Sequence, residues 1–158
     1  MLHKLKAMVV DDSRVMRNMV MEALKKSQLA EFEFLEAEDG QDALNKLAAN
    51  PVHIAFVDWN MPNMTGIEFI KAARATAKTA KEVPIPMVMV TSEKTMGKIE
   101  EAMDQAGADG FIIKPFTAEE MAKRLVKVVE RAAQLQIRKA REAAAGGNAV
   151  DGAMPRIY

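Results

Sequence analysis

The 158-residue sequence lacks several features, and their absence excludes some classes of function before any motif is considered. It contains no cysteine, which excludes a disulfide framework and thiol chemistry. Its 22 Lys and Arg residues balance 22 Asp and Glu residues, so no overall excess of positive charge attracts nucleic acid or an anionic membrane. No apolar run approaches the roughly 20 residues of a membrane span, and the amino-terminal segment lacks the features of a signal peptide. We therefore expect a cytoplasmic protein with neither nucleic acid nor a membrane as its main partner.

Short apolar runs alternate with segments of helical periodicity along the chain. Apolar runs predict strands at residues 5–10, 32–35, 54–58, 87–90 and 111–113. Helical spacing of apolar residues follows each run, at 15–24, 43–48, 67–73, 96–106 and 121–135. Strand and helix thus alternate five times, which predicts right-handed crossovers and helices on both faces of a sheet. The expected fold class is α/β, with a doubly wound, five-stranded parallel sheet.

The last helix is expected to extend beyond the domain. Thr117 and Glu120 have the spacing of a capping box at its start, and helix-forming sequence continues to Ala145. Gly146-Gly147 is expected to end the helix, and residues 148–158 are expected to form a flexible tail. We divide the chain into one domain at residues 1–132 and a helical extension with a tail at 133–158. The outer part of the helix either binds a partner or is simply a charged, solvated helix. We favour the second interpretation.

The stretch Ile54–Asp58 organises the rest of the chain. Four apolar residues end in one acid, and a loop rich in turn-forming residues follows. A wholly apolar strand belongs to a parallel sheet that is covered by helices on both faces. An acid at its last position lies at the carboxyl edge of the sheet, where open α/β folds bind their ligands.

The other expected strands also end in polar groups, which the fold would bring to the same edge. Three clustered carboxylates repel one another unless a cation compensates them, and oxygen ligands without Cys or paired His favour Mg2+. A carboxylate can also act as a nucleophile and become an aspartyl phosphate, with a hydroxyl and an amine to bind the phosphate. A single acid at a strand end would be interpreted as a solvated loop residue. Several such polar groups at the same edge of the sheet indicate a functional site. The groups are Asp11, Asp12, Glu36 at the outer edge, Asp58, Thr91 followed by Ser92, and Lys114.

Five motifs, in this order and spacing, resemble the receiver domains of bacterial two-component signalling, and most closely the single-domain chemotaxis regulators. The resemblance covers about residues 5–132. It implies a flavodoxin-like strand order 2-1-3-4-5 and a cis peptide bond between Lys114 and Pro115. The motifs are Val9-Val10-Asp11-Asp12-Ser13, Ala37-Glu38-Asp39-Gly40, residues 57–66 (VDWNMPNMTG), Val90-Thr91-Ser92-Glu93, and residues 106–116 (AGADGFIIKPF).

The resemblance also implies a chemistry for the acidic edge. Asp58 would accept a phosphoryl group from a histidine kinase or a phosphotransfer domain. Asp12, Asp58 and the backbone carbonyl of Asn60 would hold Mg2+, while Asp11 would act mainly through a water. Asn60 and Glu93 lie where family members tune self-dephosphorylation, so slow hydrolysis is expected. The chain would then be a phosphoaccepting switch and not an enzyme.

Phosphorylation would change the surface of such a switch. Thr91 would move toward the phosphate, Lys114 would pair with it, and the ring of Phe111 would follow. Ordinary core packing explains Phe111 equally well. The output surface would be the fourth helix, the fifth strand and the start of the last helix, including Lys98 and Lys123.

Several functions are compatible with these residues. A flagellar motor switch is one expected output partner, although the longer segment Thr76–Val83 and the extended last helix depart from the chemotaxis pattern. A phosphate sink or a phosphorelay shuttle is the alternative. An aspartyl phosphohydrolase is disfavoured because its paired acids usually read Asp-x-Asp, unlike Asp11-Asp12. A pure interaction module is disfavoured because Asp58, Thr91 and Lys114 are all present.

Four further basic residues are not assigned to the site. His3 and His53 have no companion at metal-binding or catalytic spacing, so surface or core positions are expected for both. Arg14 and Arg17 either contact a phosphodonor domain or are solvated, and we expect the latter. Trp59 follows Asp58 directly and is expected to serve as a reporter of the site.

Overall fold

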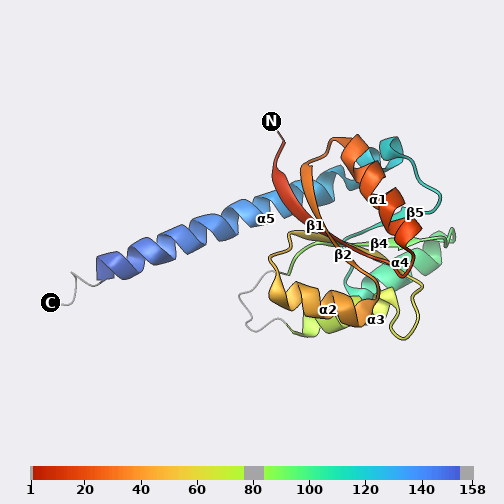
Figure 1. Ribbon diagram of the computed structural model, residues 1–158, viewed down its shortest axis with the longest axis horizontal. Helices are drawn as coiled ribbons and strands as arrows, with labels where there is room; N and C mark the ends of the chain where they lie inside the picture. Colours follow the sequence, from red (N-terminus) through yellow and green to blue (C-terminus); the bar gives the residue numbers. More distant parts are fainter. Residues whose placement is uncertain (1, 77–83, 154–158) are drawn as a thin grey trace.

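A computed structural model describes residues 2–76 and 84–153 (Figure 1). The predicted lengthening at Thr76–Val83 therefore falls almost entirely outside the described residues. Strands and helices alternate throughout the described chain, and each strand is followed by one helix. Their bounds are β1 Lys4–Val10, α1 Arg14–Ser27, β2 Glu31–Ala37, α2 Gly40–Ala49, β3 Ile54–Asp58, α3 Gly66–Ala75, β4 Met87–Thr91, α4 Met96–Ala106, β5 Gly110–Ile113 and α5 Ala118–Ala153.

The five strands form one parallel sheet in the order β2-β1-β3-β4-β5, which confirms the predicted fold class and strand order. Helices α1 and α5 cover one face and α2, α3 and α4 cover the other (Figure 1). Every residue of β3 is buried, because the central strand lies between two helical layers. Its apolar run is therefore continuous, without the alternation of a half-exposed strand.

Side-chain caps begin several of the helices near the carboxyl edge. Ser13 accepts a hydrogen bond from the backbone N–H of Met16, as its position predicted. Thr65 and Glu68 form a complete capping box at the start of α3. Thr117 accepts from the N–H of Glu120, which confirms the start of α5. These caps fix the loops that carry the polar side chains.

Helix α5 is longer than predicted. It continues through Gly146 and Gly147 to Ala153, so the predicted stop at the glycine pair and a flexible tail beginning at residue 148 are wrong. Each glycine costs a helix about 1 kcal/mol relative to alanine but keeps its N–H donor. A glycine ends a helix when it adopts a left-handed conformation that an apolar contact beyond it stabilises, so a glycine pair alone does not fix where a helix stops. Among the described residues, no helix is both long and apolar enough to cross a membrane.

An ion-pair network joins distant segments at the amino edge of the sheet. Asp109, directly before β5, accepts from Arg74 of α3 at 2.9 Å and from Arg131 of α5 at 3.2 Å. Its carboxylate also accepts from the N–H of Met87, the first residue of β4, at 2.9 Å. Arg74 donates in addition to the carbonyl of Ile85 at 2.6 Å. This one carboxylate thereby connects two strands with two helices.

Candidate functional site

The strand register brings four predicted site residues to the carboxyl edge of the sheet. Asp11 follows β1, Asp58 ends β3, Thr91 ends β4, and Lys114 follows β5. The central strands are adjacent, since Val10 pairs with Val57, Asp58 with Val90 and Thr91 with Ile113. Within this stretch the backbone N–H of Lys114 donates to the carbonyl of Thr91 at 2.7 Å. The expected clustering of these groups is therefore present in the fold.

Three carboxylates converge at this edge. One oxygen from each of Asp11, Asp12 and Asp58 lies within 4.8 Å of the others. Asp11 is 3% exposed and Asp58 is 5% exposed, whereas Asp12 is open to solvent. Only oxygen ligands are offered, with one open side, and this donor set fits Mg2+, which takes few carboxylates and keeps several waters. The residues present thus match the predicted metal-binding group.

Lys114 is the cation nearest to these acids among the described ion pairs. Its Nζ donates to Oδ1 of Asp58 at 2.8 Å and lies 3.7 Å from Oδ2 of Asp11. The Lys114-Pro115 peptide bond is cis, as the resemblance implied. One ammonium therefore faces two buried carboxylates, which leaves the cluster short of positive charge.

The pKa values of the two buried acids reflect this shortage. Burial, together with the neighbouring Asp58, raises the pKa of Asp11 to about 6 against the opposing bond from the Ser13 amide. Burial also raises the pKa of Asp58, while the bond from Lys114 and the backbone amide of Asn60 act in the opposite direction. A divalent cation would remove the conflict by compensating both charges.

The hydroxyl of Thr91 connects the site to the loop before α4. Its Oγ1 accepts from the backbone N–H of Glu93 at 2.9 Å, and its own O–H remains available to donate. The Glu93 carboxylate accepts from the N–H of Thr95 at 2.9 Å, a bond that lowers the pKa of Glu93. Glu93 thus holds the start of α4, where Thr95 makes no side-chain cap of its own. Any movement of Thr91 would disturb this loop directly.

The loop after Asp58 depends on a close approach at Gly66. The N–H of Gly66 donates to the carbonyl of Trp59 at 2.9 Å, which closes the loop onto β3. A Cβ on Gly66 would lie 2.5 Å from the backbone carbonyl oxygen of Asp58, closer than real carbon contacts allow. The sequence motif included Gly66 but did not reveal that its lack of a side chain is required by Asp58. Asn60, in the same loop, is exposed at the open side of the site.

Phe111 is half-buried and packs on the α2–α4 face of the sheet. The guanidinium of Arg124 from α5 lies 4.5 Å from the centre of its ring, a cation–π contact. Both predicted readings of Phe111 fit this position, because the ring has core neighbours and also reaches the surface. Arg124 was missed by sequence reasoning, since a basic residue on an exposed helical face carries no local sign of an aromatic partner.

One sequence prediction near the acidic edge needs revision. Glu36 lies on the outermost strand, as expected, and its Oε1 accepts from Arg17 at 2.9 Å. The expectation that Arg17 is solvated is wrong, since its side chain is only 13% exposed and contacts the backbone carbonyl of Asp11 and the carboxylate of Glu36. Arg14 is exposed as expected. His53 accepts a hydrogen bond from the N–H of Lys6 at 2.9 Å and is half-buried, which fits the expected structural position.

The family model of the response regulator receiver domain matches residues 7–126. The chain belongs to the response regulator receiver family. This receiver domain is 37% identical over 127 residues to the chemotaxis protein CheY of Pseudomonas aeruginosa, covering 80% of this chain and 98% of the relative. It is also 37% identical over 126 residues to chemotaxis protein CheY1 of Helicobacter pylori, covering 79% and 97%. The solved chemotaxis response regulator CheY4 of Vibrio cholerae has a TM-score of 0.68 at 34% identity, covering 79% and 98%.

Membership confirms the resemblance drawn from the five motifs. Receiver domains are signalling switches that interact with histidine kinases and output partners, and the family binds Mg2+ at an acidic pocket. In this receiver domain Asp11, Asp12 and Asp58 form an acidic cluster that could hold a metal ion. The relatives named here are themselves little longer than the matched region, so they are receiver domains without an attached output domain.

Proposed function

We propose that the protein is a stand-alone phosphoaccepting switch in which Asp58 is the phosphoacceptor. The observation that carries this proposal is the placement of Asp58, a 5% exposed carboxylate whose Oδ1 lies 2.8 Å from the Lys114 ammonium beside two further acids. This group of three acids with one amine and one hydroxyl has no simpler structural purpose, because its charges are not balanced within the fold.

In the proposed reaction an oxygen of Asp58 attacks the phosphorus of a phosphohistidine on a histidine kinase or phosphotransfer domain. The bond from phosphorus to the histidine nitrogen breaks, that nitrogen takes a proton, and an aspartyl phosphate forms. Lys114 then pairs with a phosphate oxygen, and the free O–H of Thr91 donates to another. Asp11, Asp12, Asp58 and the carbonyl of Asn60 would hold Mg2+, which supplies positive charge to the transferred oxygens.

The switch would act through the contact between Thr91 and Glu93. When Thr91 turns toward the phosphate, the bond from the Glu93 amide to its Oγ1 is strained or lost, and the loop before α4 rearranges. The surface formed by α4, β5 and the start of α5, with Lys98, Phe111 and Lys123, would then present a new face to an output partner. The chemotaxis relatives support a role in motility signalling, with the flagellar motor as one candidate partner.

The division of the chain is part of this proposal. The receiver unit would take in residues 1–132, with a helical extension and tail at 133–158, and a family match that ends at residue 126 supports this division. Slow self-dephosphorylation, tuned by Asn60 and Glu93, would reset the switch in the cytoplasm.

Intact mass after incubation with acetyl phosphate tests the proposal. Wild type should gain one phosphate when Mg2+ is present and none when Mg2+ is chelated, and Asp58→Ala should gain none in either case. Asp58→Ala removes a buried acid, so its folding has to be checked separately. A cooperative thermal unfolding transition would show that the variant is folded. A wild-type protein that takes up no phosphate with Mg2+ would contradict the proposal and favour a pure interaction module.

A phosphate sink or relay shuttle remains the second candidate, favoured by the Arg124 contact that holds the ring of Phe111. Hydrogen exchange of α4 separates the two functions without a partner. A switch should show changed protection over residues 92–106 after phosphorylation, whereas a sink should take up phosphate with protection there unchanged.

A further inference from the structure

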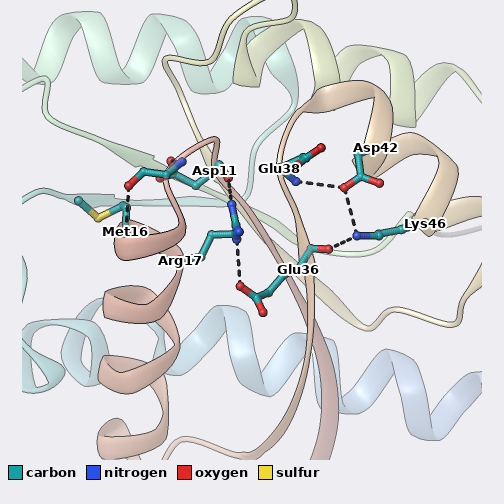
Figure 2. Close-up of polar contacts among 8 residues, drawn as sticks. Asp11, Met16, Arg17, Glu36, Glu38, Asp42 and Lys46 are labelled. Atoms are coloured by element: carbon teal, nitrogen blue, oxygen red, sulfur yellow. Dashed lines mark hydrogen bonds and ion pairs between the residues drawn. The ribbon is translucent and has the colours of Figure 1, made fainter.

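Arg17 is the least exposed arginine in the described ion pairs, and the proposed reaction does not use it. It lies in the first turn and a half of α1, with 13% of its side chain exposed. The guanidinium makes two contacts that point in different directions (Figure 2). Its Nη1 donates to the backbone carbonyl of Asp11 at 2.7 Å, and its Nε donates to Oε1 of Glu36 at 2.9 Å.

The first contact completes the fixation of Asp11. The backbone N–H of Asp11 donates to the carbonyl of Ala37 at 3.1 Å, and Oδ1 of its carboxylate accepts from the N–H of Ser13 at 2.8 Å. Arg17 holds the carbonyl, which is the remaining polar group of the residue. With all three groups held, the direction in which the carboxylate points is set by the backbone and not by solvent.

The second contact anchors Arg17 to the edge of the sheet. Glu36 of β2 accepts from Arg17 through its side chain, and its backbone carbonyl accepts from Lys46 of α2 at 2.6 Å. Lys46 also donates to Oδ2 of Asp42 at 3.1 Å, and the same oxygen accepts from the N–H of Glu38 (Figure 2). A continuous chain of polar contacts therefore leads from α2, through β2, to the acidic edge.

Electrostatic attraction to the metal does not explain the position of Arg17. A cation buried beside a cation-binding site repels the bound metal and weakens its binding. Burying most of an arginine also costs free energy unless its donors are satisfied in a fixed geometry. The guanidinium meets the second condition by donating to the carbonyl of Asp11, directly after β1, and to the carboxylate of Glu36 in β2.

We propose that Arg17 is a positioning residue for the metal at the phosphoacceptor site, acting through the backbone of Asp11. The inference rests on the proposed function and deepens it, because it names a residue outside the acidic cluster on which Mg2+ affinity depends. Partners behind metal ligands commonly change affinity by about 10- to 100-fold when removed.

The test is a Mg2+ titration followed by the fluorescence of Trp59, which directly follows Asp58 and is half-buried. Arg17→Gln should weaken Mg2+ binding by about tenfold, and Arg17→Lys should recover part of this loss because an ammonium still reaches toward the carbonyl. Glu36→Gln should give a smaller loss, since it weakens the anchor but leaves the bond to Asp11. The matched control is Arg14→Gln, which removes the same charge from an exposed position on the same helix.

The sign of the effect separates positioning from electrostatics. A purely electrostatic role predicts that Arg17→Gln, like Arg14→Gln, leaves Mg2+ binding unchanged or tightens it, and that result would overturn the proposal. Should Arg17→Gln not fold, Arg17→Lys decides, because a loss of about threefold or more supports positioning and wild-type affinity refutes it. Failure of the proposed function is distinct, since it would leave a wild type that binds Mg2+ yet takes up no phosphate from acetyl phosphate.

Discussion

Asp58 and Asp109 lie at opposite edges of the same sheet, and both accept hydrogen bonds from cationic side chains. At the amino edge, Asp109 is matched by two arginines and a backbone N–H. At the carboxyl edge, Asp58 shares one lysine with Asp11, and Asp12 adds a third negative charge nearby. The same residue type is therefore fully satisfied in one place and left short of partners in the other.

The difference separates a structural aspartate from a functional one. Donors around Asp109 come from the fold itself, so the charge stabilises the native state without a ligand. Charges at the carboxyl edge remain in conflict, a cost that the proposed Mg2+ would relieve by supplying the missing positive charge. The number of charged donors that the fold supplies therefore distinguishes the two aspartates.

The largest expected effect is at the amino edge. Asp109→Ala should lower the free energy of unfolding by about 2–4 kcal/mol, because it leaves Arg74 facing two carbonyls without its acid. Urea unfolding measures the loss. Asp104→Ala, at an exposed position of α4, is the control and should change stability by less than about 0.5 kcal/mol. Equal effects of the two substitutions would remove the contrast between the edges.

The second-largest expected effect is a steric one, at the carboxyl edge. Gly66→Ala should cost about 1–3 kcal/mol, because the new Cβ meets the carbonyl of Asp58 and the loop must shift. It should also slow phosphate uptake at Asp58, measured by intact mass at timed intervals. Gly97→Ala is the matched control, since a Cβ there meets open space, and its stability should be equal or slightly higher. A Gly66→Ala protein with wild-type stability and uptake would contradict the close approach.

Removing a negative charge from the acidic cluster should stabilise the protein. The pKa of Asp11 is raised from 3.8 to about 6, so its folded form binds protons more tightly than its unfolded form. Its contribution to stability is then present at low pH and is lost as pH rises through 6. At pH 7 without Mg2+, Asp11→Asn should therefore be more stable than wild type by about 1–2 kcal/mol.

Mg2+ should reverse that order. Wild type gains stability from the bound cation, and Asp11→Asn gains less because it has lost one acid of the cluster. Thermal unfolding with chelator and with saturating Mg2+ measures both states. If Asp11→Asn is the less stable protein even in chelator, the acidic cluster is not in electrostatic conflict.

The smallest expected effect concerns His53, near the amino edge. Burial, followed by Lys139 and Lys6, lowers the pKa of His53, and its Nδ1 must be unprotonated to accept from Lys6. The unfolded chain therefore binds more protons, and stability falls as pH drops below the unfolded value of about 6.5. Relative to His53→Asn, wild type should lose less than about 1 kcal/mol between pH 7 and pH 5. His3→Asn, at an exposed position, should keep the wild-type slope.

The acidic site could be predicted from sequence because its signals are local. β3, β4 and β5 are short apolar runs, and Asp58, Thr91 and Lys114 end or follow these runs within one residue. Once alternation predicts a parallel sheet, the strand ends must meet at one edge. The order of the strands came only from the resemblance, since apolar runs do not tell which strand lies beside which.

The supporting contacts could not be predicted for the opposite reason. Arg17 and Glu36 are 19 residues apart, and Arg74 and Asp109 are 35 apart, so no periodic pattern links them. The sequence pattern of a helix also does not distinguish an arginine that is buried from one that is solvated. The end of α5 was also beyond prediction from Gly146 and Gly147, because glycine ends a helix only where packing favours the turn.

Helix α5 begins beside the site and continues without a break to Ala153. Its base packs on α1 and β5, and its outer part extends away from the sheet (Figure 1). The 20 residues that follow Ala133 span about 30 Å, so a tilt of about 10° at the base displaces the far end by about 5 Å. A rigid helix of this length would therefore convert a small change in angle near Arg124 into a displacement of several ångströms at its far end.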